Sequence, residues 1–203
     1  MRGGRFKVHS AAEDKERLRK RIMLRRGRLR PAELREAAVA LRDVLLATPE
    51  VGRAAVVAAY VSVGTEPGTG PLLEALSRRG IRVLLPVVER DLDLNWAAYT
   101  GPSALAPARF GLLEPTGPRL GKEVIATADA VLLPGLAVDR TGMRLGRGGG
   151  SYDMALPRVA REAFSCVLLH EGELFDEPVP SDRHDWRVRS AALPSGLIRF
   201  DPV

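Results

Sequence analysis

The spacing of apolar residues predicts that the chain begins with two helices. Between residues 11 and 29, apolar side chains recur at intervals that match one face of a helix. Ser10 and Glu13 have the spacing of a capping box, which marks the start of this helix. A second helix is predicted at 32–46, after Pro31, whose fixed φ suits the first turn of a helix. We therefore expect an N-terminal helix pair.

After residue 50 the helical period gives way to short apolar runs that predict strands. Continuous apolar runs are typical of parallel strands covered on both faces, whereas the alternating run at 92–99 indicates an edge strand. Helical patterns lie at 71–79 and 152–162, and we expect Pro157 to shorten or kink the latter. The predicted buried strands are residues 54–61, 82–85, 130–133 and 164–169, and a further strand is expected at 196–200.

This order of elements predicts a three-layer αβα fold with a mostly parallel, Rossmann-like sheet. Residues 62–70 and 134–151 are expected to be loops, and each follows the carboxyl end of a predicted strand. Residues 101–121, rich in glycine and proline, and the tail from residue 171 onward are expected to be largely irregular. Because ligands of open α/β sheets bind beyond the carboxyl ends of the strands, the first two loops should face one crevice.

Composition and the absence of long apolar runs predict a cytoplasmic globular protein. The chain has 203 residues, of which 45% are hydrophobic, as is usual for one domain. We expect this domain to span residues 11–203 and residues 1–10 to form a disordered tail. The sequence has neither an apolar run of membrane-spanning length nor a secretory signal, so we predict no membrane partner. Cys166, the single cysteine, lies in an apolar run and is predicted to be a core residue.

The formal net charge of +6 raises the question of an anionic ligand. Much of the positive charge lies within the first thirty residues. At about 100° per residue, Lys15, Arg19 and Arg26 fall on one side of the first predicted helix. This side is either a solvated basic surface or a set of charges aimed at an anion, and the sequence leaves both interpretations open.

Residues 144–153 carry the most specific chemical signal of the chain. They read Arg-Leu-Gly-Arg-Gly-Gly-Gly-Ser-Tyr-Asp, which matches neither the P-loop nor the Gly-x-Gly-x-x-Gly pattern. Glycines let backbone N–H groups approach an anion closely, and arginines add charged donors. Asp153 would repel a phosphate unless a divalent cation lay between them. We therefore predict a site for Mg²⁺ and a polyphosphate, with a flexible glycine turn as the other interpretation.

Three further acidic or hydroxyl side chains are candidates for binding. Glu66 and Thr69, in the loop at 62–70, would suit a substrate amide or amine, but an ordinary polar turn explains them about as well. Asp185 either joins Asp153 at a metal ion or is an ordinary acidic residue of a loop. The histidines and the cysteine do not have the spacing of zinc ligands, so we predict no zinc site. They are His9, His170, His184 and Cys166.

Taken together, these residues resemble the 5-formyltetrahydrofolate cyclo-ligase family, also called the methenyltetrahydrofolate synthetases. The resemblance covers nearly the whole chain after about Ala11. It is most specific at 139–153, where the family shows a very similar run, although Ser151 stands where the family usually has a tyrosine. The other segments that carry it are Lys15 with Arg19, and residues 60–69, 83–86, 110–115 and 133–137.

The resemblance implies ligase chemistry with ATP and Mg²⁺ as cofactors. The formyl oxygen of 5-formyltetrahydrofolate attacks the γ-phosphate of ATP, which turns that oxygen into part of a good leaving group. The neighbouring folate nitrogen then closes the ring, and the products are 5,10-methenyltetrahydrofolate, ADP and phosphate. The partner implied is therefore a small-molecule folate, with or without a polyglutamate tail. We expect no nucleic-acid partner and a monomer.

The resemblance also implies which residues bind the nucleotide and the metal. Arg147 would offset charge that grows on the transferring phosphoryl group. The metal ligands would be Asp153 and Asp185. The ATP-binding residues would be Lys15, Arg19, Arg144, Gly146, Arg147, Gly148, Gly149, Gly150 and Asp153.

The implied folate-binding residues come from other parts of the chain. Glu66 and Thr69 would hold the substrate near its formyl group, and Tyr152 would close over the reacting centre. Trp96 would either flank the flat rings of the folate or belong to the core.

Two other classes of function remain open from the residues alone. The basic first helix would suit a nucleic-acid-binding module, but aromatic residues make up only 5% of the chain, few for a module that stacks on bases. An enzyme of sugar phosphates or acyl-CoA is the other alternative, because an α/β scaffold alone does not fix function.

Overall fold

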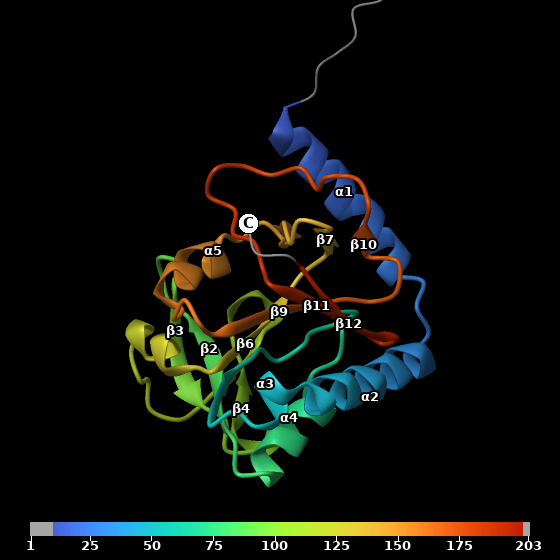
Figure 1. Cartoon of the computed structure of the whole chain (residues 1–203). Coiled ribbons are helices and arrows are strands. Elements are labelled where there is room, and N and C mark those ends of the chain that lie inside the picture. Colours follow the sequence, from blue (N-terminus) through green and yellow to red (C-terminus); the bar gives the residue numbers. More distant parts are fainter. Residues whose placement is uncertain (1–9, 201–203) are drawn as a thin grey trace, which may run out of the picture.

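The protein folds around one seven-stranded sheet, and the computed structural model describes residues 10–200 of the chain (Figure 1). Its strands are β1 (Val56–Ala58), β2 (Arg82–Val88), β3 (Leu94–Ala98), β6 (Ala130–Pro134), β9 (Phe164–Leu168), β11 (Ser190–Leu193) and β12 (Gly196–Arg199). They lie in the order β12-β11-β9-β6-β1-β2-β3. Neighbours from β11 to β2 run parallel, whereas the edge strands β12 and β3 are antiparallel to their neighbours. The predicted mostly parallel sheet and the edge strand near residue 95 are confirmed.

Helices cover both faces of this sheet and complete the three predicted layers. One face is covered by α2 (Pro31–Ala47), α3 (Pro49–Gly52) and α4 (Gly70–Arg78). The other face is covered by α5 (Ser151–Ala155) and by the 3-10 helices Lys122–Thr127 and Leu156–Arg158. Successive strand residues point to opposite faces, so that Val57 joins the first core cluster and Ala58 the second.

The first helix, α1 (Ala11–Arg26), begins at the predicted capping box. The Ser10 hydroxyl accepts a hydrogen bond from the Glu13 backbone N–H at 3.3 Å, and the Glu13 carboxylate accepts one from the Ser10 N–H at 2.9 Å. The helix lies across the carboxyl end of the sheet (Figure 1), away from α2, which covers a face. Ile22 of α1 packs in a third, smaller core with Leu145 and Val179.

Several short strands lie in segments that the sequence pattern predicts to be irregular. Residues 134–151 contain β7 (Ala137–Asp139) and β8 (Arg144–Leu145), which form a small sheet with β10 (Leu174–Phe175). Residues 101–121 contain the hairpin of β4 (Leu105–Pro107) and β5 (Leu113–Pro115). Strand β11 lies in the tail and was also missed. These predictions were wrong because strands of two to four residues are too short to show a period.

Of two prolines in predicted elements, only Pro157 has the effect that its chemistry predicts. Pro157 shortens the helix expected at 152–162, since α5 ends at Ala155 and the chain continues in a 3-10 helix. Pro86, by contrast, does not end its strand, because β2 continues to Val88. Strand β1 pairs with β2 only as far as Leu84, so beyond that point β2 needs hydrogen bonds on the β3 side alone.

A buried ion pair holds α1 in place. Arg26 is 1% exposed and donates two hydrogen bonds to the carboxylate of Glu173, at 2.8 and 2.7 Å, while Glu173 itself is completely buried. The same guanidinium donates to the Gly135 carbonyl at 2.7 Å, and the Glu173 carboxylate also accepts the His170 N–H at 2.8 Å. The end of α1 is thereby joined to the chain after β6 and after β9.

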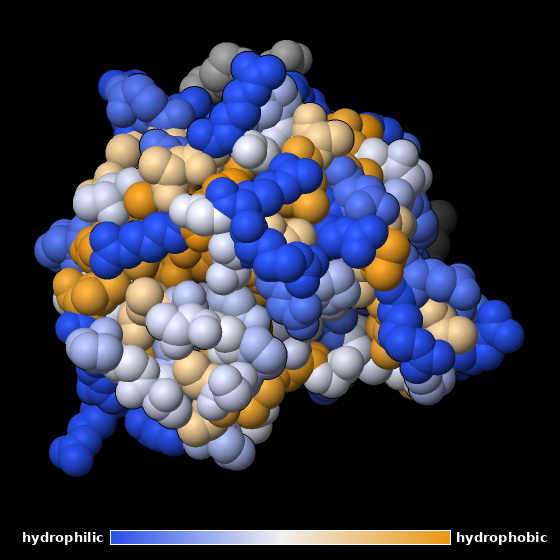
Figure 2. All heavy atoms as spheres, turned by 90° about the horizontal axis from the view of Figure 1, so that it is seen from below, coloured by the Kyte–Doolittle hydropathy of each residue, from blue (hydrophilic) through white to orange (hydrophobic). Residues whose placement is uncertain are grey.

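One face of the molecule is of mixed hydropathy (Figure 2). The face at the bottom of Figure 1 is seen in Figure 2, where small groups of hydrophobic residues are interspersed among hydrophilic ones. Within residues 10–200, no helix has both the length and the apolar character needed to cross a membrane. The expected disordered tail falls almost entirely on residues 1–9, outside the described part of the chain.

Removal of Arg26 should destabilise the fold strongly. Arg26→Met leaves the buried Glu173 charge with only the half-exposed Arg25, at 3.5 Å, which should cost about 3 kcal/mol of the free energy of unfolding. Adding Glu173→Gln removes that charge, keeps an acceptor for the His170 N–H, and should recover much of the loss. Urea denaturation measures both. The control is Arg78→Met, which breaks the exposed pair with Glu74 and should cost less than about 1 kcal/mol. Equal costs at the two sites would contradict the anchoring role of Arg26.

Candidate active site

A cavity of about 620 Å³ opens at the carboxyl ends of the parallel strands. Strand β1 lies between β6 and β2, so the chain order reverses at this point of the sheet, where α/β proteins usually bind ligands. Residues of both predicted loops line the cavity, among them Glu66 from the first and Gly146 from the second. The expectation that these loops face one crevice is confirmed.

The glycine run forms an exposed loop on one side of the cavity. Gly148 and Gly150 have φ values of +103° and +73°, which side chains other than glycine rarely adopt. A Cβ at Gly146 would lie 2.9 Å from a guanidinium nitrogen of Arg144, so a side chain there would require that guanidinium to move. From α1, Arg19 donates a hydrogen bond from Nε to the Gly146 carbonyl at 3.0 Å. The backbone of this loop is therefore shaped by its glycines and held by the first helix.

Lys15 lies on the same side of α1 and reaches two carboxylates. Its Nζ donates to Asp185 at 2.5 Å and to Asp182 at 2.7 Å, and its side chain is 9% exposed. The hydrogen bond from Lys15 holds the pKa of Asp182 below its ordinary value. Lys15, Arg19 and Asp185 all line the cavity. Of the two interpretations of the basic helix face, the geometry favours charges aimed at the site.

Arg144 and Asp153 form a second ion pair across the loop. One guanidinium nitrogen of Arg144 donates to Asp153 Oδ1 at 2.9 Å, and another donates to the Pro134 carbonyl at 3.1 Å. Arg144 Nε and the Tyr152 hydroxyl are buried without a hydrogen-bond partner, which is unusual for donors in a protein interior. Burial, together with the nearby charge of Glu66, raises the pKa of Tyr152, so its hydroxyl stays protonated. Both groups are thus unpaired donors of residues that line the cavity.

Glu66 and Arg147 meet across the cavity from loops that follow different strands. Arg147 Nη1 lies 3.1 Å from Glu66 Oε1, and the other carboxylate oxygen accepts the Val63 N–H at 2.9 Å. Glu66 is 9% exposed, whereas the Arg147 side chain is 46% exposed. The carboxylate is therefore fixed and the arginine is free to change partners.

The acidic residues of the cavity suit a magnesium ion shared with a ligand. Asp153 and Asp185 both line it, and each already has a cationic partner, Arg144 or Lys15. Among the described residues there is no cluster of three or more acidic, histidine or cysteine side chains able to hold a metal alone. Mg²⁺ commonly binds one or two carboxylates together with phosphate oxygens, and these residues fit that arrangement.

Two candidate residues of the substrate site, Thr69 and Trp96, do not lie at the cavity. Thr69 is completely buried: its hydroxyl donates to the Tyr60 carbonyl at 2.7 Å and accepts the Ser62 N–H at 3.0 Å. It closes the loop at 62–70 and does not line the cavity. Trp96 is also completely buried, in the second core cluster, and does not line the cavity either. The core interpretation of Trp96, which the sequence left open, is correct.

An apolar wall on the side of the cavity near β3 was missed by the sequence analysis. Leu92, Phe110 and Leu113 line the cavity and are 36%, 67% and 39% exposed. Leu92 and Phe110 have φ values of +69° and +60°, and within residues 10–200 no other residue except glycine has a positive φ. Strain of this kind is found at binding sites. A positive φ at a residue other than glycine cannot be recognised from the sequence, so the sequence analysis did not identify these residues as part of a site.

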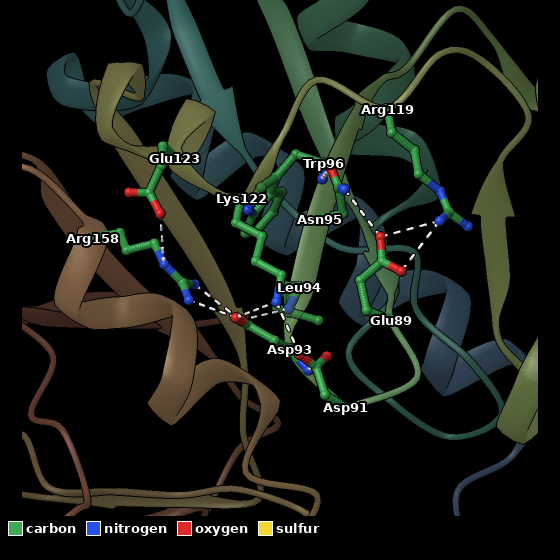
Figure 3. A network of polar contacts seen from close by, with 10 residues as sticks. All are labelled: Glu89, Asp91, Asp93, Leu94, Asn95, Trp96, Arg119, Lys122, Glu123 and Arg158. Atoms are coloured by element: carbon green, nitrogen blue, oxygen red, sulfur yellow. Dashed lines mark hydrogen bonds and ion pairs between the residues drawn. The ribbon is translucent and has the colours of Figure 1, made fainter.

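Ion pairs fix the hairpin that carries Leu92 (Figure 3). The carboxylate of Asp93 binds Arg158 through two hydrogen bonds, at 2.9 and 2.5 Å, and lies 2.9 Å from Lys122. The Arg158 guanidinium holds the pKa of Asp93 well below its usual range. On the other side of the hairpin, Glu89 binds Arg119. Leu92 is therefore carried by a hairpin that ion pairs hold in place.

His170 supports the loop that carries Glu66. Its Nε2 lies 3.1 Å from the Thr65 carbonyl, so the neutral ring donates to this oxygen. Burial lowers the pKa of His170, although the charge of Glu173 acts in the opposite direction. The ring is therefore neutral in the folded protein near neutral pH.

Comparisons of sequence and of structure with known proteins point to the same family. The sequence profile of the 5-formyltetrahydrofolate cyclo-ligase family matches residues 11–194. The 5-formyltetrahydrofolate cyclo-ligase of Mycolicibacterium smegmatis is 45% identical over 87% of this chain and 92% of that protein. The Escherichia coli cyclo-ligase is 34% identical over 86% of this chain and 97% of that protein. The solved structure of Aquifex aeolicus 5,10-methenyltetrahydrofolate synthetase superposes with a TM-score of 0.79 at 28% identity, covering 93% of this chain and 94% of that one.

The buried His170 should make stability fall in mild acid. Its folded-state pKa lies below the ordinary value of 6.5, so the unfolded chain takes up a proton first as the pH falls. This contribution to the free energy of unfolding is complete above about pH 6.5 and is lost below it. In His170→Gln, the difference between pH 7.5 and 5.5, measured by urea denaturation, should be smaller than in the wild type. His184→Gln, at an exposed position, is the control and should behave as the wild type. An unchanged difference in His170→Gln would contradict the assignment.

Proposed function

The chain belongs to the 5-formyltetrahydrofolate cyclo-ligase family, a family of ligases, and on this premise we propose that it converts 5-formyltetrahydrofolate to 5,10-methenyltetrahydrofolate with ATP and Mg²⁺. One observation carries the proposal: Glu66 and Arg147, from separate loops, meet at 3.1 Å in the cavity that also holds the glycine loop and both aspartates. A carboxylate that would bind the folate and an arginine that would bind phosphate are thereby close together.

The proposed reaction has two steps. The formyl oxygen of the folate forms a bond to the γ-phosphorus of ATP, and ADP leaves. The neighbouring folate nitrogen then attacks the formyl carbon, the bond between that carbon and its oxygen breaks, and phosphate departs. The nitrogen loses its proton as the methenyl bridge forms. A formyl oxygen alone is a poor leaving group, so transfer of the phosphoryl group lowers the barrier to ring closure.

The nucleotide side of the site would act mainly by positioning and charge, as is usual in phosphoryl transfer. The backbone from Gly146 to Gly150 would bind phosphate oxygens, with Lys15 and Arg19 contributing from α1. Arg147 would exchange Glu66 for the transferring phosphoryl group, because its guanidinium is exposed at the cavity. Arg144 is buried and binds Asp153, so it would hold that carboxylate in position and offer its free Nε to an anion.

A metal ion would be held by Asp153 and Asp185 together with phosphate oxygens. When bound, Mg²⁺ supplies positive charge that offsets the triphosphate and the developing negative charge. Lys15 and Arg144 keep the two carboxylates fixed for this purpose.

The folate side would use the fixed carboxylate and the apolar wall. Glu66, whose second oxygen is held by the Val63 N–H, would bind the folate near its formyl group. Tyr152, with a protonated hydroxyl that lacks a protein partner, would donate a hydrogen bond to the reacting centre. Phe110 and Leu92 would contact the flat rings. A cytoplasmic monomer that binds no nucleic acid remains our prediction for the whole protein.

Loss of the charges assigned to catalysis should nearly abolish turnover. Arg147→Ala should lower kcat by about 10²–10³, the effect of removing one donor that stabilises a transition state. Asp153→Asn should lower it comparably, since the variant keeps an acceptor for Arg144 but loses the charge that would bind the metal. The measurement follows the near-ultraviolet absorbance of methenyltetrahydrofolate with MgATP and 5-formyltetrahydrofolate.

A nearby arginine provides the matched control for these variants. Arg140 is exposed and pairs with Asp176 away from the cavity, so Arg140→Ala should retain wild-type turnover. Circular dichroism and urea denaturation would verify that each variant is folded. Wild-type rates in Arg147→Ala and Asp153→Asn would refute the assigned roles, and absence of product with the wild-type protein would refute the proposed reaction.

A further inference from the structure

A second cavity, of about 760 Å³, adjoins the one described above. The two share Gly150, Asp153 and Asp185, which are residues of the proposed phosphate and metal site. The second cavity is also lined by Met154 and Trp186, and the apolar wall of the first cavity has no part in it. Phosphates bound at the shared residues would therefore adjoin both cavities.

Exposed apolar side chains concentrate at these two cavities. In the part of the chain that the structure describes, eight large hydrophobic residues are exposed. Leu92, Phe110 and Leu113 line the first cavity, and Met154 and Trp186, 38% and 44% exposed, line the second. An indole and a thioether beside an open cavity are suited to a flat ring, because aromatic faces stack on bases and methionine adapts its shape to them.

The segment that carries Trp186 is held at both ends. Asp185 binds Lys15 of α1, and on the other side the Val188 N–H donates to the Gly142 carbonyl at 2.8 Å. Arg187 forms an isolated bridge with Met143. The indole is therefore presented to the cavity from a fixed stretch of chain.

The volumes favour one ligand in each cavity. A single ligand of ordinary size occupies a pocket of roughly 300–1,000 Å³. The first cavity, about 620 Å³, would have to contain the folate rings and the reacting phosphate together. The nucleoside part of ATP then needs separate room, which the second cavity offers beside the shared aspartates.

We propose that Trp186, together with Met154, stacks on the base of the nucleotide whose phosphates occupy the shared residues. This inference rests on the proposed use of ATP. It makes Trp186 a residue that determines nucleotide affinity and takes no part in the chemical step.

The test compares ligands with and without a base. In the presence of Mg²⁺, calorimetry would measure the Kd of ADP and of inorganic tripolyphosphate for the wild type and for Trp186→Leu. The variant should bind ADP about tenfold more weakly or worse, the loss expected for one base–aromatic stack, and should bind tripolyphosphate as the wild type does. Trp186→Phe keeps a ring and should recover most of the ADP affinity.

Fluorescence gives a second measurement that does not depend on turnover. The chain has two tryptophans, and Trp96 is completely buried, so a change in emission on ADP addition should arise from Trp186 and vanish in Trp186→Leu. Phe110→Leu is the matched control: it alters an exposed aromatic residue of the first cavity and should leave ADP affinity unchanged. With MgATP and 5-formyltetrahydrofolate, Trp186→Leu should raise the KM for ATP and leave kcat nearly unchanged.

Three results would overturn the inference. The first is unchanged ADP affinity in Trp186→Leu, and the second is an equal loss for tripolyphosphate, which would indicate a distorted phosphate site. The third is a loss confined to folates with a polyglutamate tail, because Arg183 and Arg187 also line the second cavity and would suit an acidic chain. If the wild type forms no methenyl product but binds ADP as described, the proposed reaction fails and the base site stands.

Discussion

The site depends on one buried ion pair far from the chemistry. Arg26 and Glu173 join the end of α1 to the loops that follow β6 and β9. Arg19 and Lys15 lie seven and eleven residues earlier, which is close to two and three turns of an α-helix, so all three point to the same side. Fixing Arg26 therefore directs the other two charges at the glycine loop and at Asp185. A helix that covers neither face of the sheet becomes one wall of the active site.

The charged side chains of the cavity form ion pairs with one another. Lys15 binds Asp185, Arg144 binds Asp153, and Arg147 binds Glu66. These pairs keep the side chains in place before substrates bind, so little reorganisation is needed when charge develops. A metal-bound triphosphate brings both signs of charge, and it would satisfy the aspartates and the basic residues at the same time.

Much of the fold, and the place of the glycine loop at the cavity, was predictable because those features have local signatures. Each of these features is encoded by a few consecutive residues. They are the capping box of α1, the apolar runs of the strands and the glycine-rich loop. The sequence left Thr69 and Trp96 open between a substrate role and a structural one, since their burial depends on contacts with other parts of the chain. The apolar wall was missed for a related reason, because the positive φ of Phe110 is set by tertiary packing.

The most direct test of the account is a crystal structure of the protein with Mg²⁺, 5-formyltetrahydrofolate and a non-hydrolysable analogue of ATP. The account predicts triphosphate density along the backbone from Gly146 to Gly150, with the metal ion between Asp153 and Asp185 and the folate against the apolar wall. A nucleotide bound away from the glycine loop, or a metal ion bound away from the two aspartates, would contradict it.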